Sequence, residues 1–158
     1  MQLTVTSKGF FKKEFIIARD GVALAKMGVL GMEATLTATD GAVHQYIIET
    51  QAQNTRLALV CRSGGADVAM LEPMTVETVL DGVDLNGRRY GLERMENKEF
   101  SLRCDGRPIG TLTRRGGWFS RGFVIDAGQD IPTEAVGLLV FMAMAYPALR
   151  IFAYSATR

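Results

Sequence analysis

The sequence predicts a closed antiparallel β-barrel of about 12 strands around a central apolar helix near the C-terminus. Two observations support this fold. Within residues 1–128, short runs of Val, Ile, Thr and Phe alternate with turn signals, as in strands joined by tight turns. Residues 135–149 contain no charged side chain, and apolar residues lie on every side of the helix they would form. Because such a helix must be enclosed, we treat residues 1–158 as one domain with its helix at about 131–154.

Local signals define both ends of the helix. Asp130 suits the N-cap, Pro132 the first turn, where a missing N–H costs nothing, and Glu134 the positive end of the helix dipole. Pro147 predicts a kink or stop near Tyr146. The uninterrupted segment then spans on the order of 24 Å at 1.5 Å per residue. This is shorter than the roughly 20 residues that cross a bilayer, so we expect protein to enclose it.

The strands are predicted from runs of apolar and β-branched residues. In chain order these runs are 15–18, 22–27, 33–39, 43–50, 55–62, 67–71, 75–80, 88–95, 100–104, 109–114 and 122–125. Asp-Gly between apolar runs is the strongest short-range hairpin signal, and it occurs at Asp20, Asp40, Asp81 and Asp105. Tight turns between successive strands predict an antiparallel meander of roughly ten to twelve strands.

A sheet of this size is expected to close around the helix. Open sheet edges favour aggregation, and large sheets curl or close. A barrel of about eight strands is filled by its own side chains, whereas an eleven-stranded can holds a central helix. We therefore expect four helix side chains to be almost free of solvent contact: Leu139, Phe141, Met142 and Met144.

One pattern occurs twice. Residues 15–27 and 100–112 share a Phe, an aliphatic residue, Asp-Gly and a later aliphatic residue, at a constant offset of 85. Any hairpin would reproduce part of this pattern. The offset is about half of the chain, however, which suits a barrel whose two halves are built alike.

The hairpins and the ending of the chain together resemble a known family. The hairpins read Phe-x-aliphatic-x-x-Asp-Gly at 15–21 and 100–106, and the second is followed by Ile-Gly-Thr-Leu at 109–112 and Gly-Phe-Val-Ile-Asp at 122–126. Asp-Ile-Pro at 130–132 then leads into the apolar helix. This layout is similar to the tubby-like C-terminal superfamily, which comprises tubby domains, LURP-one-related proteins and phospholipid scramblases. The resemblance, closest to compact bacterial members, implies a twelve-stranded barrel around a C-terminal helix.

The resemblance also implies functions. Tubby domains bind phosphoinositide headgroups through basic residues on the barrel wall, but no particular Lys/Arg pair of this chain aligns with theirs. Scramblase-like members carry an acidic, calcium-binding segment before the helix. The corresponding segment here has only two carboxylates, Asp126 and Asp130. Calcium takes six to eight oxygen ligands, so no metal site is predicted.

Composition and isolated residues disfavour several classes of function. The 18 Lys and Arg residues against 17 Asp and Glu leave a net charge of +1, unlike a strongly basic nucleic-acid-binding protein. Cys61 and Cys104 lie in strand-like runs and are expected to be buried or half-buried free thiols. His44 is the only histidine and is expected to be an ordinary sheet residue. No catalytic, phosphate-binding or cofactor motif is found, and the start of the chain lacks the apolar run of a signal peptide. We therefore expect a non-catalytic cytoplasmic protein without a cofactor.

Two stretches that mix basic and aromatic residues are the candidate binding elements. Their cations are Lys8, Lys12, Lys13, Arg114, Arg115 and Arg121, and their large aromatic residues are Phe10, Phe11, Trp118 and Phe119. Such loops can place rings among lipid acyl chains and cations near phosphates, or can stack on a single nucleic-acid strand. Alternatively, the rings plug the barrel and the charges are simply solvated. The near-neutral charge favours a local headgroup patch over a nucleic-acid track.

Three functional hypotheses follow. In the first, the barrel is non-catalytic and binds anionic phospholipid headgroups at a membrane surface, or binds a protein partner. In the second, the chain is a scramblase-like or tail-anchored membrane protein, although Pro147 and Arg150 argue against insertion of the helix. In the third, a pocket at the barrel mouth serves a small-molecule carrier or an enzyme. We favour the first.

Overall fold

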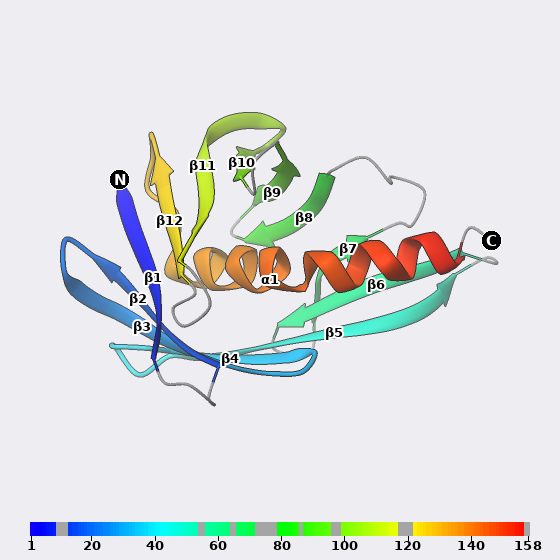
Figure 1. Ribbon diagram of the computed structural model, residues 1–158, viewed down its shortest axis with the longest axis horizontal. Helices are drawn as coiled ribbons and strands as arrows, with labels where there is room; N and C mark the ends of the chain where they lie inside the picture. The colour runs from blue at the N-terminus through cyan, green and yellow to red at the C-terminus, as the bar shows by residue number, and fades with distance from the viewer. Residues whose placement is uncertain are drawn as a thin grey trace.

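The computed structural model describes residues 1–8, 13–53, 56–63, 66–71, 79–85, 87–95, 99–116 and 122–156, with side chains described for 1–7, 14–47, 87–93, 95, 99–116 and 122–144. This part of the chain is mainly β, with one antiparallel sheet and one C-terminal helix (Figure 1). The strands are β1 (Gln2–Lys8), β2 (Lys13–Arg19), β3 (Val22–Leu30), β4 (Glu33–Ala38), β5 (Val43–Gln53), β6 (Arg56–Ser63), β7 (Ala66–Leu71), β8 (Val79–Leu85), β9 (Arg88–Arg94), β10 (Glu99–Cys104), β11 (Arg107–Arg115) and β12 (Gly122–Ala127), and the helix is α1 (Thr133–Ala156).

The sheet follows the chain and joins its two ends. Its order is β7-β6-β5-β4-β3-β2-β1-β12-β11-β10-β9-β8, and every described neighbour pairs in antiparallel fashion. Thr4 of β1 lies opposite Val124 of β12. Between β7 and β8, the outermost strands of this order, no pairing occurs among the described residues, so the described sheet is open there.

The first strand was missed in the sequence. Leu3 and Val5 of β1 are buried, whereas Thr4 and Thr6 are exposed. This is the alternation expected of a strand with one face on the core. The Leu-Thr-Val-Thr pattern could have identified β1 from the sequence, but the run is short.

Helix α1 is enclosed on every side over its first half. All nine residues from 135 to 143 are buried, which amounts to about two and a half turns and covers the whole circumference. Figure 1 shows strands on both sides of the helix, and α1 contacts β3, β4, β6, β8 and β9. Leu139, Phe141 and Met142 are buried as predicted. Met144 is only partly buried against the core, so its predicted exclusion from solvent was wrong.

The predicted ends of the helix need two corrections. The first intrahelical bond runs from Val136 N to Pro132 O at 3.0 Å, which makes Pro132 the N-cap. Asp130 therefore does not cap the helix, and its carboxylate accepts a hydrogen bond from Arg19 instead. Second, the sequence predicts a kink or a stop near Tyr146, and α1 continues past Pro147 to Ala156, so the helix does not stop there. Packing outweighs intrinsic propensity in most protein helices.

The Asp-Gly signals are turns in three of the four places. Asp20 and Gly21 have φ of 50° and 79°, and Asp105 and Gly106 have 50° and 78°, the positive values that a type I′ hairpin requires at both positions. The pair at Asp40 also forms a turn, in which Asp40 Oδ1 accepts from Ala42 N at 2.9 Å.

The fourth Asp-Gly signal, at Asp81, is not a turn. Asp81 lies inside β8, where the register against β9 shifts between Asp81 and Val83. The intervening glycine thus marks a bulge, which is the other common use of glycine in a strand.

Three hairpins share one irregularity. In β2–β3, β6–β7 and β10–β11, one residue of the second strand has no partner in the first strand, at the same distance from the turn. The register shifts there between Ile17 and Ala18, between Cys61 and Arg62, and between Leu102 and Arg103 of the first strands. The first strand of each hairpin ends with Arg19, Ser63 and Cys104, respectively. The strand before the hairpin places a buried side chain opposite each of these residues, namely Leu3, Tyr46 and Tyr90. The two hairpins with the repeated sequence pattern therefore share their geometry with β6–β7, and β1–β4, β5–β8 and β9–β12 follow one plan.

Candidate functional site

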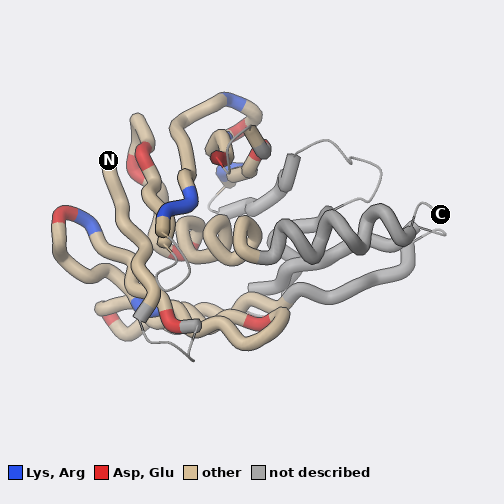
Figure 2. The backbone as a smooth tube through the Cα atoms, in the orientation of Figure 1, with Lys and Arg blue, Asp and Glu red and all other residues tan. Residues whose placement is uncertain are grey.

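The antiparallel meander has two ends with different character. We call the end at which the chain passes from β1 to β2 and from β11 to β12 the basic end. We call the opposite end, where β12 leads into α1, the helix-entry end. Among residues 133–144, the part of α1 whose side chains are described, Glu134 is the only charged residue, and the described charges lie mainly on the sheet and its turns (Figure 2).

The two basic–aromatic stretches begin and end on neighbouring strands of the basic end. Gly122, at the start of β12, lies opposite Thr6 of β1 on one side and opposite Arg115 of β11 on the other. Lys8 lies opposite Glu14 at the adjoining ends of β1 and β2. Stretches about a hundred residues apart in the sequence are therefore attached to the sheet side by side.

Two of the predicted site residues have described side chains. Arg114 and Arg115 are both exposed at the end of β11. Successive strand residues point to opposite faces, and Arg114 shares its face with the buried Leu112. Arg114 thus lies on the inner rim of the sheet, and Arg115 on the outer rim.

The other predicted site residues lie outside this description. Lys8 and Lys13 belong to β1 and β2 by their backbone, but their side chains are not among those described. The rest of the set lies outside the described residues: Lys12, Arg121, Phe10, Phe11, Trp118 and Phe119.

Exposed apolar side chains accompany these cations. Lys13 pairs with Val29, which places the β3–β4 turn at the basic end, and this turn exposes Leu30 and Met32. Met95, just after β9, is exposed at the same end. Sequence reasoning missed all three residues, because an isolated Leu or Met in a turn has no distinctive pattern.

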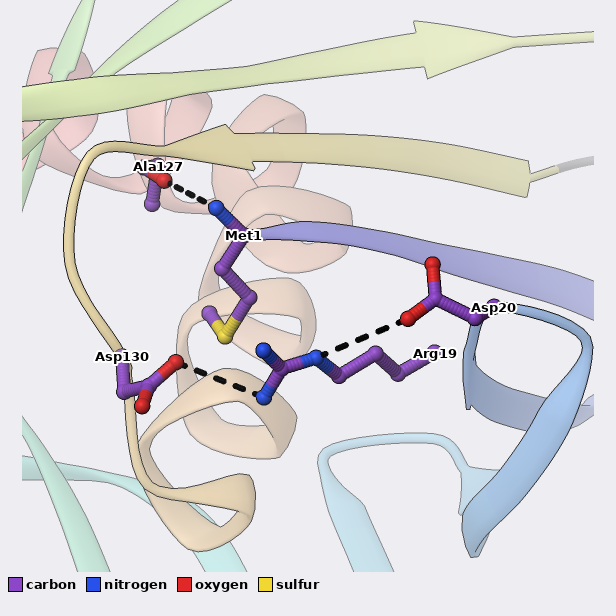
Figure 3. Close-up of polar contacts among 5 residues, drawn as sticks. All are labelled: Met1, Arg19, Asp20, Ala127 and Asp130. Atoms are coloured by element: carbon purple, nitrogen blue, oxygen red, sulfur yellow. Dashed lines mark hydrogen bonds and ion pairs between the residues drawn. The ribbon is translucent and has the colours of Figure 1, made fainter.

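The helix-entry end is held by polar contacts. The Arg19 guanidinium reaches Asp130 Oδ1 at 3.3 Å and Asp20 Oδ2 at 4.0 Å (Figure 3). The Met1 ammonium donates to the carbonyl oxygen of Ala127 at 2.7 Å. These contacts tie β1, the β2–β3 turn and the segment before α1 together. Asp130 is thus engaged with an arginine.

The only histidine also belongs to this end. His44 Nδ1 lies 3.2 Å from Glu134 Oε1, and the Tyr46 hydroxyl donates to the carbonyl oxygen of Glu134 at 2.8 Å. Both contacts connect β5 with the first turn of α1. His44 thus helps to position the helix rather than being an ordinary sheet residue.

Cys104 is a buried free thiol, as predicted, whereas the Cys61 side chain lies outside the described set. Burial raises the pKa of the neighbouring Tyr90 above its ordinary 10.0, and the nearby Cys104 adds to this effect. Among the described residues, no group of three or more His, Cys, Asp and Glu could hold a metal ion.

No known family model matches this chain, and no curated protein or solved structure is significantly similar to it. The tubby-like resemblance therefore stays a prediction. Among the described residues, no helix is both long and apolar enough to cross a bilayer.

Proposed function

We propose that this chain is a non-catalytic, tubby-like barrel that binds anionic phospholipid headgroups through its basic end, as a peripheral protein of the cytoplasmic membrane surface. The observation that carries the proposal is the pairing of Thr6 and Arg115 with the same residue, Gly122. It attaches both basic–aromatic stretches to neighbouring strands. Clustered cations next to aromatic rings suit an anionic membrane surface.

Closure of the barrel belongs to this proposal. In the units β1–β4 and β9–β12, the third strand pairs with the fourth. The equivalent strands of the middle unit are β7 and β8, and some of their Cα atoms lie within 8 Å of each other. The shared plan of the three units therefore supports a β7–β8 pairing, which would close the sheet around α1.

The non-catalytic part of the proposal rests on how the reactive side chains are used. His44 is engaged with Glu134 at the start of α1, and Cys104 is buried in the core. A nucleophile needs an accessible position and an adjacent base. Cys104 lacks the accessible position because it is buried.

Charge reversal at the basic end tests the proposal. Arg114→Glu/Arg115→Glu should lower partition onto vesicles containing phosphatidylserine by at least about tenfold, because each cation near an anionic surface contributes about 1 kcal/mol. The wild-type chain should float with these vesicles, and not with pure phosphatidylcholine. Its binding should weaken as salt is added.

A matched control reverses two exposed cations elsewhere, Lys26→Glu/Arg107→Glu, with the same change in net charge. It should bind nearly as the wild type does. Lys12→Glu/Lys13→Glu should behave like the Arg114/Arg115 variant. Wild-type protein that ignores every anionic vesicle, or a control that loses as much binding as the Arg114/Arg115 variant, would contradict the proposal.

A further inference from the structure

The β3–β4 turn carries Leu30, the most exposed large apolar side chain among the described residues. Leu30 is 83% exposed and Met32 is 41% exposed, on either side of Gly31. Burying such side chains is favourable by about 0.8 kcal/mol per CH₂ group. Large apolar side chains at a turn tip contribute nothing to the core and so are available to a partner.

The position of this turn indicates the partner. Val29 of β3 pairs with Lys13 of β2, so the turn after β3 lies at the same end of the sheet as the end of the first basic stretch. Arg114 and Arg115 are exposed on the same end of the sheet. Apolar side chains at a turn could contact the acyl chains of a bilayer, while nearby cations contact its anionic headgroups.

The opposite end offers a contrast. Its exposed large apolar residues, Val22 and Val43, flank turns that carry Asp20 and Asp40. Arg88, Arg89 and Arg107 are also exposed at this end, but no basic–aromatic stretch lies there. Exposed apolar side chains therefore occur at both ends, but they accompany the basic stretches at only one of them.

We infer that Leu30 and Met32 insert into the bilayer as an apolar wedge while the neighbouring cations hold the headgroups. This inference rests on the proposed function and adds how the protein is oriented. Glu33, exposed on the β4 side of the turn, would then remain at the headgroup level. The chain would bind with its basic end facing the membrane and its helix-entry end facing away from it.

The test removes the wedge without changing charge. Leu30→Ser/Met32→Ser should lower partition onto phosphatidylserine vesicles by about tenfold or more at every salt concentration. The dependence of binding on salt should stay as in the wild type. Arg114→Glu/Arg115→Glu should instead flatten that dependence, because it removes the screened contribution.

The control is Val22→Ser/Val43→Ser, which removes two side chains that are 66% and 58% exposed at the helix-entry end. It should bind like the wild type, and both variants should keep a cooperative thermal transition. If the wild type binds but the wedge variant binds equally well, the inference fails and the proposed function stands. Equal losses in both variants, or a flattened salt dependence of the wedge variant, would also overturn it. If the wild type binds no vesicle, the proposed function fails, and the wedge with it.

Discussion

Ending the chain at Gly128, so that α1 is missing, is expected to abolish folding. The helix packs against the sheet with side chains that are almost solvent-free, including Leu138, Leu139, Val140 and Phe141. Burial of each such side chain contributes about 1.5–3 kcal/mol, and a whole domain is stable by only about 5–15 kcal/mol. The truncated chain should therefore show no cooperative transition in urea and should aggregate.

A second variant separates loss of the helix from mere shortening of the chain. Leu139→Asp keeps the full length but places a charge among buried apolar residues, which is strongly unfavourable without a partner. It should show the same loss of cooperative unfolding. A truncated protein that remains soluble and melts cooperatively would show that the sheet does not depend on α1.

Gly110→Ala is expected to have the largest effect of any single methyl addition in the described sheet. A Cβ atom at this position would lie 2.0 Å from the carbonyl oxygen of Asp126 and 2.7 Å from Ala127 Cα. Both are backbone atoms of the paired strand β12, so relief of the clash requires β11 and β12 to separate. We expect the free energy of unfolding to fall by about 4 kcal/mol or more, measured in urea by circular dichroism.

Gly28→Ala is the matched control in another strand of the same sheet. Gly28 has open space around its added Cβ and needs no positive φ. The substitution should leave stability unchanged or raise it by about 0.5–1 kcal/mol, because glycine is unfavourable inside strands. Comparable destabilisation in both variants would contradict the close approach of β11 and β12.

The fold class could be predicted from the sequence because its signals are local. Alternating apolar runs identify strands, Asp20-Gly21 and Asp105-Gly106 identify two hairpins, and the uncharged stretch after Glu134 identifies a buried helix. In two places the structure differs from what these local signals predict, because packing outweighs them. Pro147 did not end α1. The glycine after Asp81 formed a bulge within a strand rather than a turn.

The candidate site could be predicted only in part. The sequence identifies its basic and aromatic residues, but their adjacency depends on the pairing of β1 with β12, which joins distant segments of the chain. The contact of His44 with Glu134 depends equally on where α1 enters the sheet. The exposure of Leu30 and Met32 follows from how the β3–β4 turn projects. None of these relations has a local sequence signal.

The pairing of β1 with β12 also constrains the order of events at the ribosome. During synthesis β1 emerges before the other strands, yet one of its neighbours is separated from it by more than a hundred residues. The edge of β1 that pairs with β12 stays unpaired while the strands between them are made, and α1 is translated after all of the described strands. Contacts of such long range slow folding and lengthen the exposure of unpaired edges. The nascent chain should thus rely on chaperones until β12 and α1 have emerged.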